Sequence, residues 1–262
     1  MRTAAIVSKT IAADAVIRSR SEVQPLSALP SRNLLLACLP EEDYQRLSPH
    51  LEVVSMELGQ AVYEAGAAMK HVHFPIDCII SLFYVMENGD SAEIAMVGSE
   101  GMAGISLALG SEIATGRAVV QSDGRAFRLD GTLLQQEFAR AGALQNLLLR
   151  YTEALFSQIT QTAACNKHHS VPQQLCRWLL LSLDRLSGDR LMTTQGLIAN
   201  MLGVRRSGVT EAALKLQDAG LIRYSHGHIE VLDRPGLEKR VCECYGVVKR
   251  EFDRLLPALK AL

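Results

Sequence analysis

The sequence predicts an α+β protein with an N-terminal antiparallel β-roll, a long helix and a C-terminal winged helix-turn-helix. Three observations support this order. Turn signals recur roughly every 8 to 12 residues between residues 51 and 129, a spacing typical of short antiparallel strands. No glycine or proline interrupts the amphipathic pattern of residues 143–169. A helix, a glycine turn and a second helix then fit residues 194–221.

Composition sets limits on the class of protein. The chain has 262 residues, of which 48% are hydrophobic, so it is long enough for two modest domains. Its 27 Lys and Arg residues nearly balance 28 Asp and Glu residues, so a nucleic-acid surface must arise from local charge. The apolar runs are far shorter than the roughly 20 residues that cross a bilayer. We therefore expect a cytoplasmic protein without membrane contact, preceded by a flexible N-terminal extension over residues 1–29.

Residues 30–142 are predicted to form the β-roll, which we assign as a sensor domain. β-branched and aromatic residues, which favour strands, gather in short runs between the turn signals. The runs are Val53–Val54, Val62–Tyr63, Val72–Phe74, Ile79–Met86, Ile94–Val97 and Ala118–Gln121. Asn88-Gly89 is the strongest turn signal, because a type I′ hairpin turn needs positive φ at both central positions. We expect the flanking strands to pair directly.

Residues 143–169 are predicted to form the long helix. Its apolar stripe recurs at steps of three and four residues. The stripe consists of Leu144, Leu148, Tyr151, Leu155, Ile159 and Thr162. Two uses are open for it, since it can pack on the roll as ordinary core or form a seam with a second copy of the helix.

Residues 170–240 are predicted to form the winged helix-turn-helix, followed by a C-terminal helix within 241–262. Ser170 and Thr194 are candidate N-caps, and Gly203 permits the left-handed backbone of a sharp turn. A second helix is expected to begin at about Arg205. The residues expected to pack inward from it are Val209, Ala213, Leu214 and Leu216. Two short runs around His226-Gly227 predict the hairpin that forms the wing.

The exposed start of the second helix is the candidate DNA-binding surface. Arg206 is the first choice for base readout, because a guanidinium donates two parallel hydrogen bonds to guanine. Arg205 is assigned to phosphate. Ser207 and Thr210 are further donors to phosphates or base edges. The full predicted set is Thr194, Gln195, Arg205, Arg206, Ser207, Thr210, Glu211 and, at the wing tip, His226.

The order of these parts resembles the Crp/Fnr superfamily of bacterial transcription regulators over roughly residues 30–240. The motifs that carry the resemblance are Thr194 to Leu221, Val62-Tyr-Glu-Ala-Gly66, His73-Phe-Pro75, Met86-Glu-Asn-Gly-Asp90 and Gly98-Ser-Glu-Gly-Met102. The resemblance implies a homodimer joined through a long dimerisation helix and bound to a pseudo-palindromic operator in double-stranded DNA. The resemblance favours the use of the apolar stripe as a dimer seam. It implies contact with RNA polymerase if the protein is an activator. It also assigns recognition positions to Gln195, Arg206, Ser207 and Glu211.

The effector site departs from the family pattern. A cyclic-nucleotide pocket in this family resembles Gly-Glu-Leu followed by Arg-Ser-Ala, whereas this chain has Gly104-Ile105-Ser106 and, later, Arg117-Ala118. Ile105 cannot accept a hydrogen bond from a ribose, so binding of cyclic AMP is not expected. The candidate effector residues are nevertheless Gly104, Ile105 and Arg117.

No cofactor is expected. The iron-sulfur branch of the family would show clustered N-terminal cysteines, and residues 1–37 contain none. Cys242-x-Cys244 is either a redox switch or a pair of inert core thiols. The histidines 71, 73, 168 and 169 suggest a metal or haem, but strand edges and an exposed helix end explain them better, so no metal is predicted.

Two other functions compete with DNA binding. One is a small-molecule sensor that signals through protein contacts, in which case Arg205 and Arg206 are dispensable for binding DNA. The other is an enzyme. The sequence shows no G-x-S-x-G, H-E-x-x-H, Walker or G-x-G-x-x-G motif. We therefore predict a DNA-binding regulator and not an enzyme.

Overall fold

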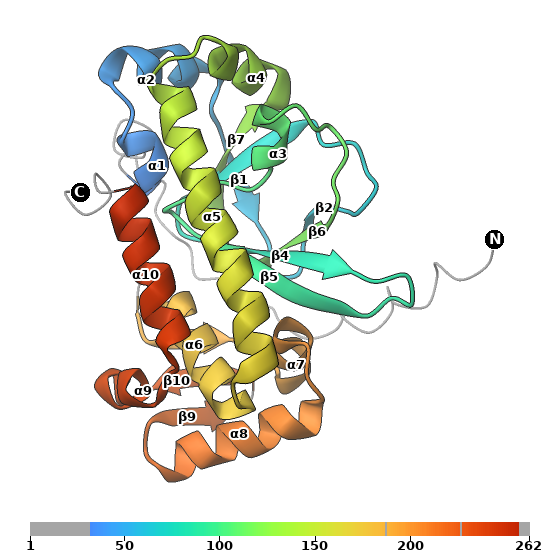
Figure 1. Ribbon diagram of the computed structural model, residues 1–262, viewed down its shortest axis with the longest axis vertical. Coiled ribbons are helices and arrows are strands. Elements are labelled where there is room, and N and C mark those ends of the chain that lie inside the picture. The colour runs from blue at the N-terminus through green and yellow to red at the C-terminus, as the bar shows by residue number, and fades with distance from the viewer. Residues whose placement is uncertain (1–31, 187, 226, 257–262) are drawn as a thin grey trace.

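The computed structural model describes residues 32–186, 188–225 and 227–256. Figure 1 shows three parts. A β-roll lies at one end, a compact helical domain with a small sheet lies at the other, and the long helix α5 runs between them. This arrangement confirms the predicted α+β fold class. The extension 1–29 lies outside the described residues.

The roll is built from two antiparallel sheets, ordered β1-β7-β3 and β2-β6-β4-β5. Small and apolar side chains, among them Cys78, Ala118 and Ala126, fill the space between them. The strands are β1 Glu52–Met56, β2 Ala61–Tyr63, β3 His71–Pro75, β4 Ile79–Val85, β5 Ser91–Val97, β6 Arg117–Ser122 and β7 Gly124–Asp130. The helices of this part are α1 Leu34–Ala37, α2 Glu41–Leu47, α3 Ile105–Ala108 and α4 Gly131–Ala139, with a 3-10 turn at Ser48–His50.

The β4–β5 hairpin pairs as predicted, but its turn is of another type. Val85 lies opposite Ser91, so five residues form the loop. Gly89 has φ +89°, whereas Ala141 is the only non-glycine residue with positive φ in the described ranges. Asn88 therefore lacks the conformation that a type I′ turn requires. Its side-chain Oδ1 instead accepts a hydrogen bond from the backbone N–H of Asp90 at 3.1 Å.

The long helix α5 spans Ala143–His168 and anchors to the roll. The Tyr151 hydroxyl donates to the carbonyl of Met102 at 2.8 Å, and the Gln158 amide donates to the carbonyl of Met96 at 3.1 Å. A Cβ on Gly101 would come within 2.5 Å of the Tyr151 ring, so the glycine permits this close packing. α10, Glu243–Leu255, runs antiparallel beside α5 (Figure 1).

The described part of the C-terminal domain packs four helices against a three-stranded sheet. Its order is α6 Val171–Leu183, β8 Arg190–Met192, α7 Gln195–Leu202, α8 Arg206–Asp218, β9 Ile222–Ser225, β10 His228–Val231 and α9 Arg234–Arg240. The sheet order is β8-β10-β9. The two wing strands were predicted, whereas the edge strand β8 was not, because its three residues give no periodic signal.

The two domains meet at an apolar junction that also holds a buried polar chain. Ile79, Phe83 and Met96 of the roll share one core with α6. Within it, Ser81 Oγ lies 2.6 Å from Glu93 Oε2 and 2.7 Å from Gln121 Oε1. One hydroxyl proton cannot serve both acceptors, so this geometry fits a protonated Glu93 that donates to Ser81. Burial raises the pKa of Glu93 to about 7, which agrees with that assignment.

No helix in the described ranges is both long and apolar enough to cross a membrane.

Candidate nucleic-acid interface

The helix-turn-helix is formed by α7, a glycine turn and α8. The Thr194 hydroxyl accepts a hydrogen bond from the Leu197 backbone N–H at 3.2 Å, which caps the start of α7 as predicted. Gly203 ends the helix with φ +63° and ψ +34°, so the chain turns sharply before α8. The turn packs against the roll, because a Cβ at Gly203 would lie 3.3 Å from the Cβ of Ala92 on β5.

The start of α8 presents an exposed basic surface. Arg205 is the N-cap, with an extended backbone, and Arg206 is the first helical residue. Arg205, Arg206 and Ser207 are all exposed. Neither arginine makes an ion pair or side-chain hydrogen bond within the described part of the chain. Two such guanidinium groups beside the free N–H groups of a helix N-terminus suit a phosphate backbone.

The buried face of α8 corrects one expectation. Val209 and Ala213 point inward as predicted, and Leu216 does too. Leu214 is 52% exposed, and Ala212 takes the inward position instead. The physical reason is the helical period of 3.6 residues, which places a residue two positions from Ala212 on the opposite side.

The side chains of Gln195 and Thr210 are joined by a hydrogen bond. The Thr210 hydroxyl lies 2.7 Å from Gln195 Oε1 and 3.0 Å from the carbonyl of Arg206. The single hydroxyl proton therefore has two acceptors, Gln195 Oε1, which links α7 to α8, and the Arg206 carbonyl within α8. This contact leaves the Gln195 amide N–H₂ as the group available to a ligand.

Glu211 extends the surface by one turn of α8. Its carboxylate accepts a hydrogen bond from Lys215 Nζ at 2.7 Å, and this contact lowers the pKa of the exposed Glu211. The ionised carboxylate is an acceptor only, so it suits a base donor such as the cytosine amino group and repels phosphate.

Two arginines of the wing sheet are paired with a glutamate within the chain. Glu230 on β10 pairs with Arg190 at 3.1 Å and with Arg223 at 2.8 Å. The single carboxylate is shared by two guanidinium groups, so it offsets one of their two positive charges. The wing-tip residue His226 lies outside the described residues.

The candidate effector residues lie on two elements of the roll, α3 and β6. Gly104, with φ +95°, directly precedes α3, and Ile105 packs in the core of the roll. Arg117 Nε instead pairs with Glu64 Oε2 at 3.1 Å. A cavity of about 580 Å³ lies elsewhere on the roll, where His50, His71 and Arg128 contribute to its lining.

The residues predicted for the dimer interface face the core of their own chain. Leu144, Leu148, Tyr151, Leu155 and Thr162 are buried within a single chain, and Ile159 is half-buried. The five buried side chains are already packed within their own chain and cannot also form a seam with a partner, so the interface predicted through these five is corrected. The exposed large apolar residues of α5 are Leu149 and Phe156, two turns apart on one face.

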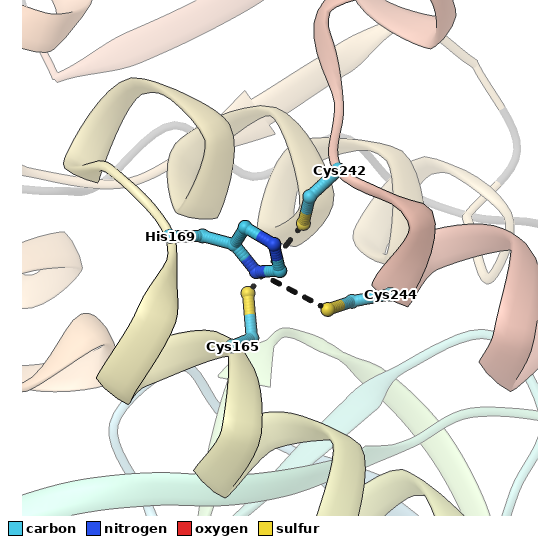
Figure 2. A group of neighbouring side chains, drawn as sticks. All are labelled: Cys165, His169, Cys242 and Cys244. Atoms are coloured by element: carbon cyan, nitrogen blue, oxygen red, sulfur yellow. Dashed lines mark hydrogen bonds between the residues drawn. The ribbon is translucent and has the colours of Figure 1, made fainter.

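Sequence reasoning missed a second cluster. Cys165 and His169 at the end of α5 lie beside Cys242 and Cys244 at the start of α10, as Figure 2 shows. The available signals were the i, i+4 spacing of Cys165 and His169 and the Cys-x-Cys pair. Neither signal alone has the four ligands of a metal site, and the 72 residues between His169 and Cys242 hide their proximity in sequence.

Comparison with known proteins identifies a family model and solved structures that resemble this chain. Residues 173–240 match the model of the Crp-like helix-turn-helix domain. No curated protein sequence matches the chain significantly. The fold is that of Crp/Fnr regulators, shared with solved structures at low sequence identity.

Three solved structures illustrate the similarity. A Crp/Fnr-family putative transcriptional regulator from Eubacterium rectale is 17% identical, with a TM-score of 0.63, covering 78% of this chain and 96% of its own. CLP, described as a c-di-GMP responsive global regulator from Xanthomonas campestris, is 16% identical, with a TM-score of 0.60 and coverages of 73% and 99%. FixK2 from Bradyrhizobium japonicum is 12% identical, with a TM-score of 0.60 and coverages of 73% and 98%.

The chain combines the fold of these regulators with a Crp-like winged helix-turn-helix, a class of domain that binds DNA. Residues 173–240 thus form a Crp-like helix-turn-helix domain, and the chain shares the fold of Crp/Fnr regulators, in agreement with the resemblance seen in the sequence.

Proposed function

We propose that this protein is a sequence-specific, DNA-binding transcription regulator that acts in the cytoplasm as a homodimer on a pseudo-palindromic operator. The observation that carries the proposal is the start of α8, where Arg205 and Arg206 are exposed and make no ion pair within the described chain. The helix is held at a fixed angle by the Gly203 turn, which is the geometry with which a recognition helix enters a major groove.

The homodimer is proposed to form through the outer face of α5. Phe156 is 64% exposed and Leu149 is 47% exposed, although both lie on a long, well-packed helix. Pairing α5 with its copy would cover both side chains and place the two α8 helices on one side of the dimer. Two recognition helices related by a two-fold axis read a pseudo-palindromic site.

Regulation is proposed to be independent of cyclic AMP. Ile105 provides no acceptor for a ribose hydroxyl, and Arg117 is already engaged by Glu64. An activator of this type would also contact RNA polymerase. We propose no enzymatic activity and no membrane partner.

The test is selection of bound duplexes from a random pool by the purified protein, in parallel with and without cyclic AMP. A palindromic motif enriched equally in both samples is the expected result. Enrichment only with cyclic AMP would overturn the proposed independence. A sensor that signals only through protein contacts would enrich no motif, and its residual DNA binding would be unchanged in an Arg206→Ala variant.

A further inference from the structure

The cluster of Cys165, His169, Cys242 and Cys244 brings four metal-binding side chains to one point. The three cysteines are buried, and the His169 side chain is 18% exposed. Their four ligand atoms all lie within 4.8 Å of one another, contributed by the end of α5 and the start of α10 (Figure 2). None of the cysteines in the described ranges is joined in a disulfide.

The distances fit a single tetrahedral ion. With metal–sulfur bonds of about 2.3 Å, the sulfurs of a tetrahedral site lie about 3.8 Å apart, and sulfur and nitrogen slightly less. Cys165 Sγ lies 3.6 Å from Cys242 Sγ, and Cys244 Sγ lies 3.4 Å from His169 Nδ1. The four atoms therefore stand close to the corners that one ion requires. A cluster of several iron atoms would need its sulfurs farther apart.

We propose that Cys165, His169, Cys242 and Cys244 bind one zinc ion in a closed structural site. Three thiolates and one imidazole are a ligand set typical of structural zinc, and with four protein ligands no position is left for a substrate. On binding, the ion replaces the protons of the three thiols, which are released to solvent.

The surroundings support the assignment through contacts to the ligands. His169 Nε2 lies 3.4 Å from Glu243 Oε2, so a carboxylate orients the ring while Nδ1 faces the sulfurs. The Gln161 amide donates to Cys244 Sγ at 3.0 Å, as donors do to metal-bound thiolates. Cys242 is the N-cap of α10, where the helix N-terminus stabilises a thiolate.

A buried arginine balances the charge of such a site. Three thiolates around a divalent ion carry a net charge of −1, which is costly to bury alone. Arg177 is buried and lies close enough to Cys165 to favour its thiolate electrostatically. One of its guanidinium nitrogens donates to Thr162 at 3.2 Å, while Nε has no hydrogen-bond partner in the described chain.

The position of the site indicates its role. It joins the C-terminal end of α5 to the start of α10, immediately before α6 opens the C-terminal domain at Val171. An ion at this point would fix the angle at which the helix-turn-helix domain leaves the long helix. The zinc site itself does not depend on the proposed DNA binding.

The test measures zinc in the full-length protein purified under reducing conditions without chelator. We expect about one zinc per chain in the wild type, and less than a tenth of that in Cys165→Ser and Cys242→Ser. Cys78→Ala is the matched control, because Cys78 is buried in the roll, far from the site, and should leave zinc content unchanged. Glu243→Gln should keep the ion but weaken its affinity about 10- to 100-fold.

A second measurement keeps the proposal testable if the serine variants do not fold. Cobalt added to the wild-type protein should give the strong visible absorption of a tetrahedral cobalt–thiolate site, lost on addition of zinc. Reduced wild-type protein that takes up neither ion would overturn the proposal. So would zinc that persists in both serine variants, or a Cys165–Cys242 disulfide in metal-free native protein. Because zinc content is measured without DNA, failure here is distinguishable from failure of operator binding.

Discussion

Arg205 and Arg206 are neighbours in sequence, but the backbone gives them different positions. Arg205 is the N-cap with φ −69° and ψ 142°, outside the helical conformation, whereas Arg206 is the first residue inside α8. A side chain that projects from the helix itself reaches into a groove, while the cap residue lies nearer its edge, where the phosphates are. The two residues should therefore contribute differently to specificity.

Arg206→Ala is expected to weaken binding to the best operator by about 1 to 3 kcal/mol and to relax the preference at one base pair. Arg205→Ala should weaken all duplexes alike and reduce the slope of affinity against salt by about one. Fluorescence anisotropy on the selected operator and on scrambled DNA measures both effects. Arg140→Ala, an exposed change on the roll, is the control, and identical salt slopes in all three variants would contradict the assignment.

Glu93 gives the junction a dependence on pH. Burial raises its pKa from 4.5 to about 7, although the charges of Arg177 and Arg185 favour the ionised form. Below pH 4.5 both the folded and the unfolded protein hold this proton. Between pH 4.5 and about 7 the unfolded chain has released it while the folded chain keeps it. Stability contributed by the neutral carboxyl is therefore lost over this range, by up to about 1.4 kcal/mol per pH unit.

Glu93→Gln should remove this part of the pH dependence, because an amide donates to Ser81 without titrating. Denaturant unfolding at pH 5 and pH 7.5 measures the difference. The wild type should lose more stability than Glu93→Gln over this interval, and Glu57→Gln at an exposed glutamate should behave like the wild type. Parallel pH profiles in Glu93→Gln and wild type would exclude a neutral Glu93.

At the scale of elements, the turn between α7 and α8 decides how the recognition helix is presented. Gly203 has φ +63°, a left-handed conformation that costs a residue with a Cβ roughly 1 kcal/mol. The added Cβ would also meet Ala92 on the roll at 3.3 Å. Gly203 therefore sets the angle of α8 and also allows the helix-turn-helix to pack closely against β5.

Gly203→Ala is expected to lower the free energy of unfolding by about 1 to 2 kcal/mol and to weaken operator binding. Gly196→Ala is the matched control, because that glycine lies inside α7 and the nearest contact of an added Cβ is 3.9 Å away. Chemical denaturation and anisotropy give the two readouts. A Gly203→Ala protein as stable as Gly196→Ala would show that the left-handed turn is not required.

At the scale of the whole molecule, α5 has two faces with different partners. One face packs on the roll through Tyr151 and its neighbours, and the face with Leu149 and Phe156 is exposed in the single chain. The proposed dimer uses the exposed face.

Phe156→Glu should therefore convert the dimer to monomers and lower operator affinity at least tenfold, since one chain then reads only a half-site. Light scattering after size-exclusion chromatography measures the mass. Leu58→Glu, at an exposed leucine of the roll, should leave the mass unchanged. A wild-type monomer bound to a complete operator would contradict the proposed assembly.

The zinc ion would act on the molecule as a whole by tying α10 to α5. Removal of the ion by a strong chelator is expected to lower the thermal unfolding midpoint and operator affinity, and restored zinc should recover both. Differential scanning calorimetry with and without chelator measures the effect, with Cys165→Ser as the reference. A wild-type midpoint that does not respond to chelator would argue against a structural ion.

Much of the fold could be predicted because its signals are local. Thr194 as a cap, Gly203 as a turn and the uninterrupted stripe of residues 143–169 each follow from spacing within a few residues. The exposed start of α8 was predicted for the same reason. β7 was missed, although it pairs with both β1 and β3, because Arg125 and Arg128 break the apolar pattern that marks a strand.

The sequence by itself determined the order of the parts, the helix-turn-helix and its two arginines, because capping, glycine turns and helical periodicity act between near neighbours. The tertiary structure alone decided which face of α5 is buried, that Glu230 pairs with Arg190 and Arg223, and that Cys165, His169, Cys242 and Cys244 meet. These depend on contacts between residues far apart in the chain. Periodicity shows that a helix has an apolar stripe, but it does not identify the surface that the stripe covers.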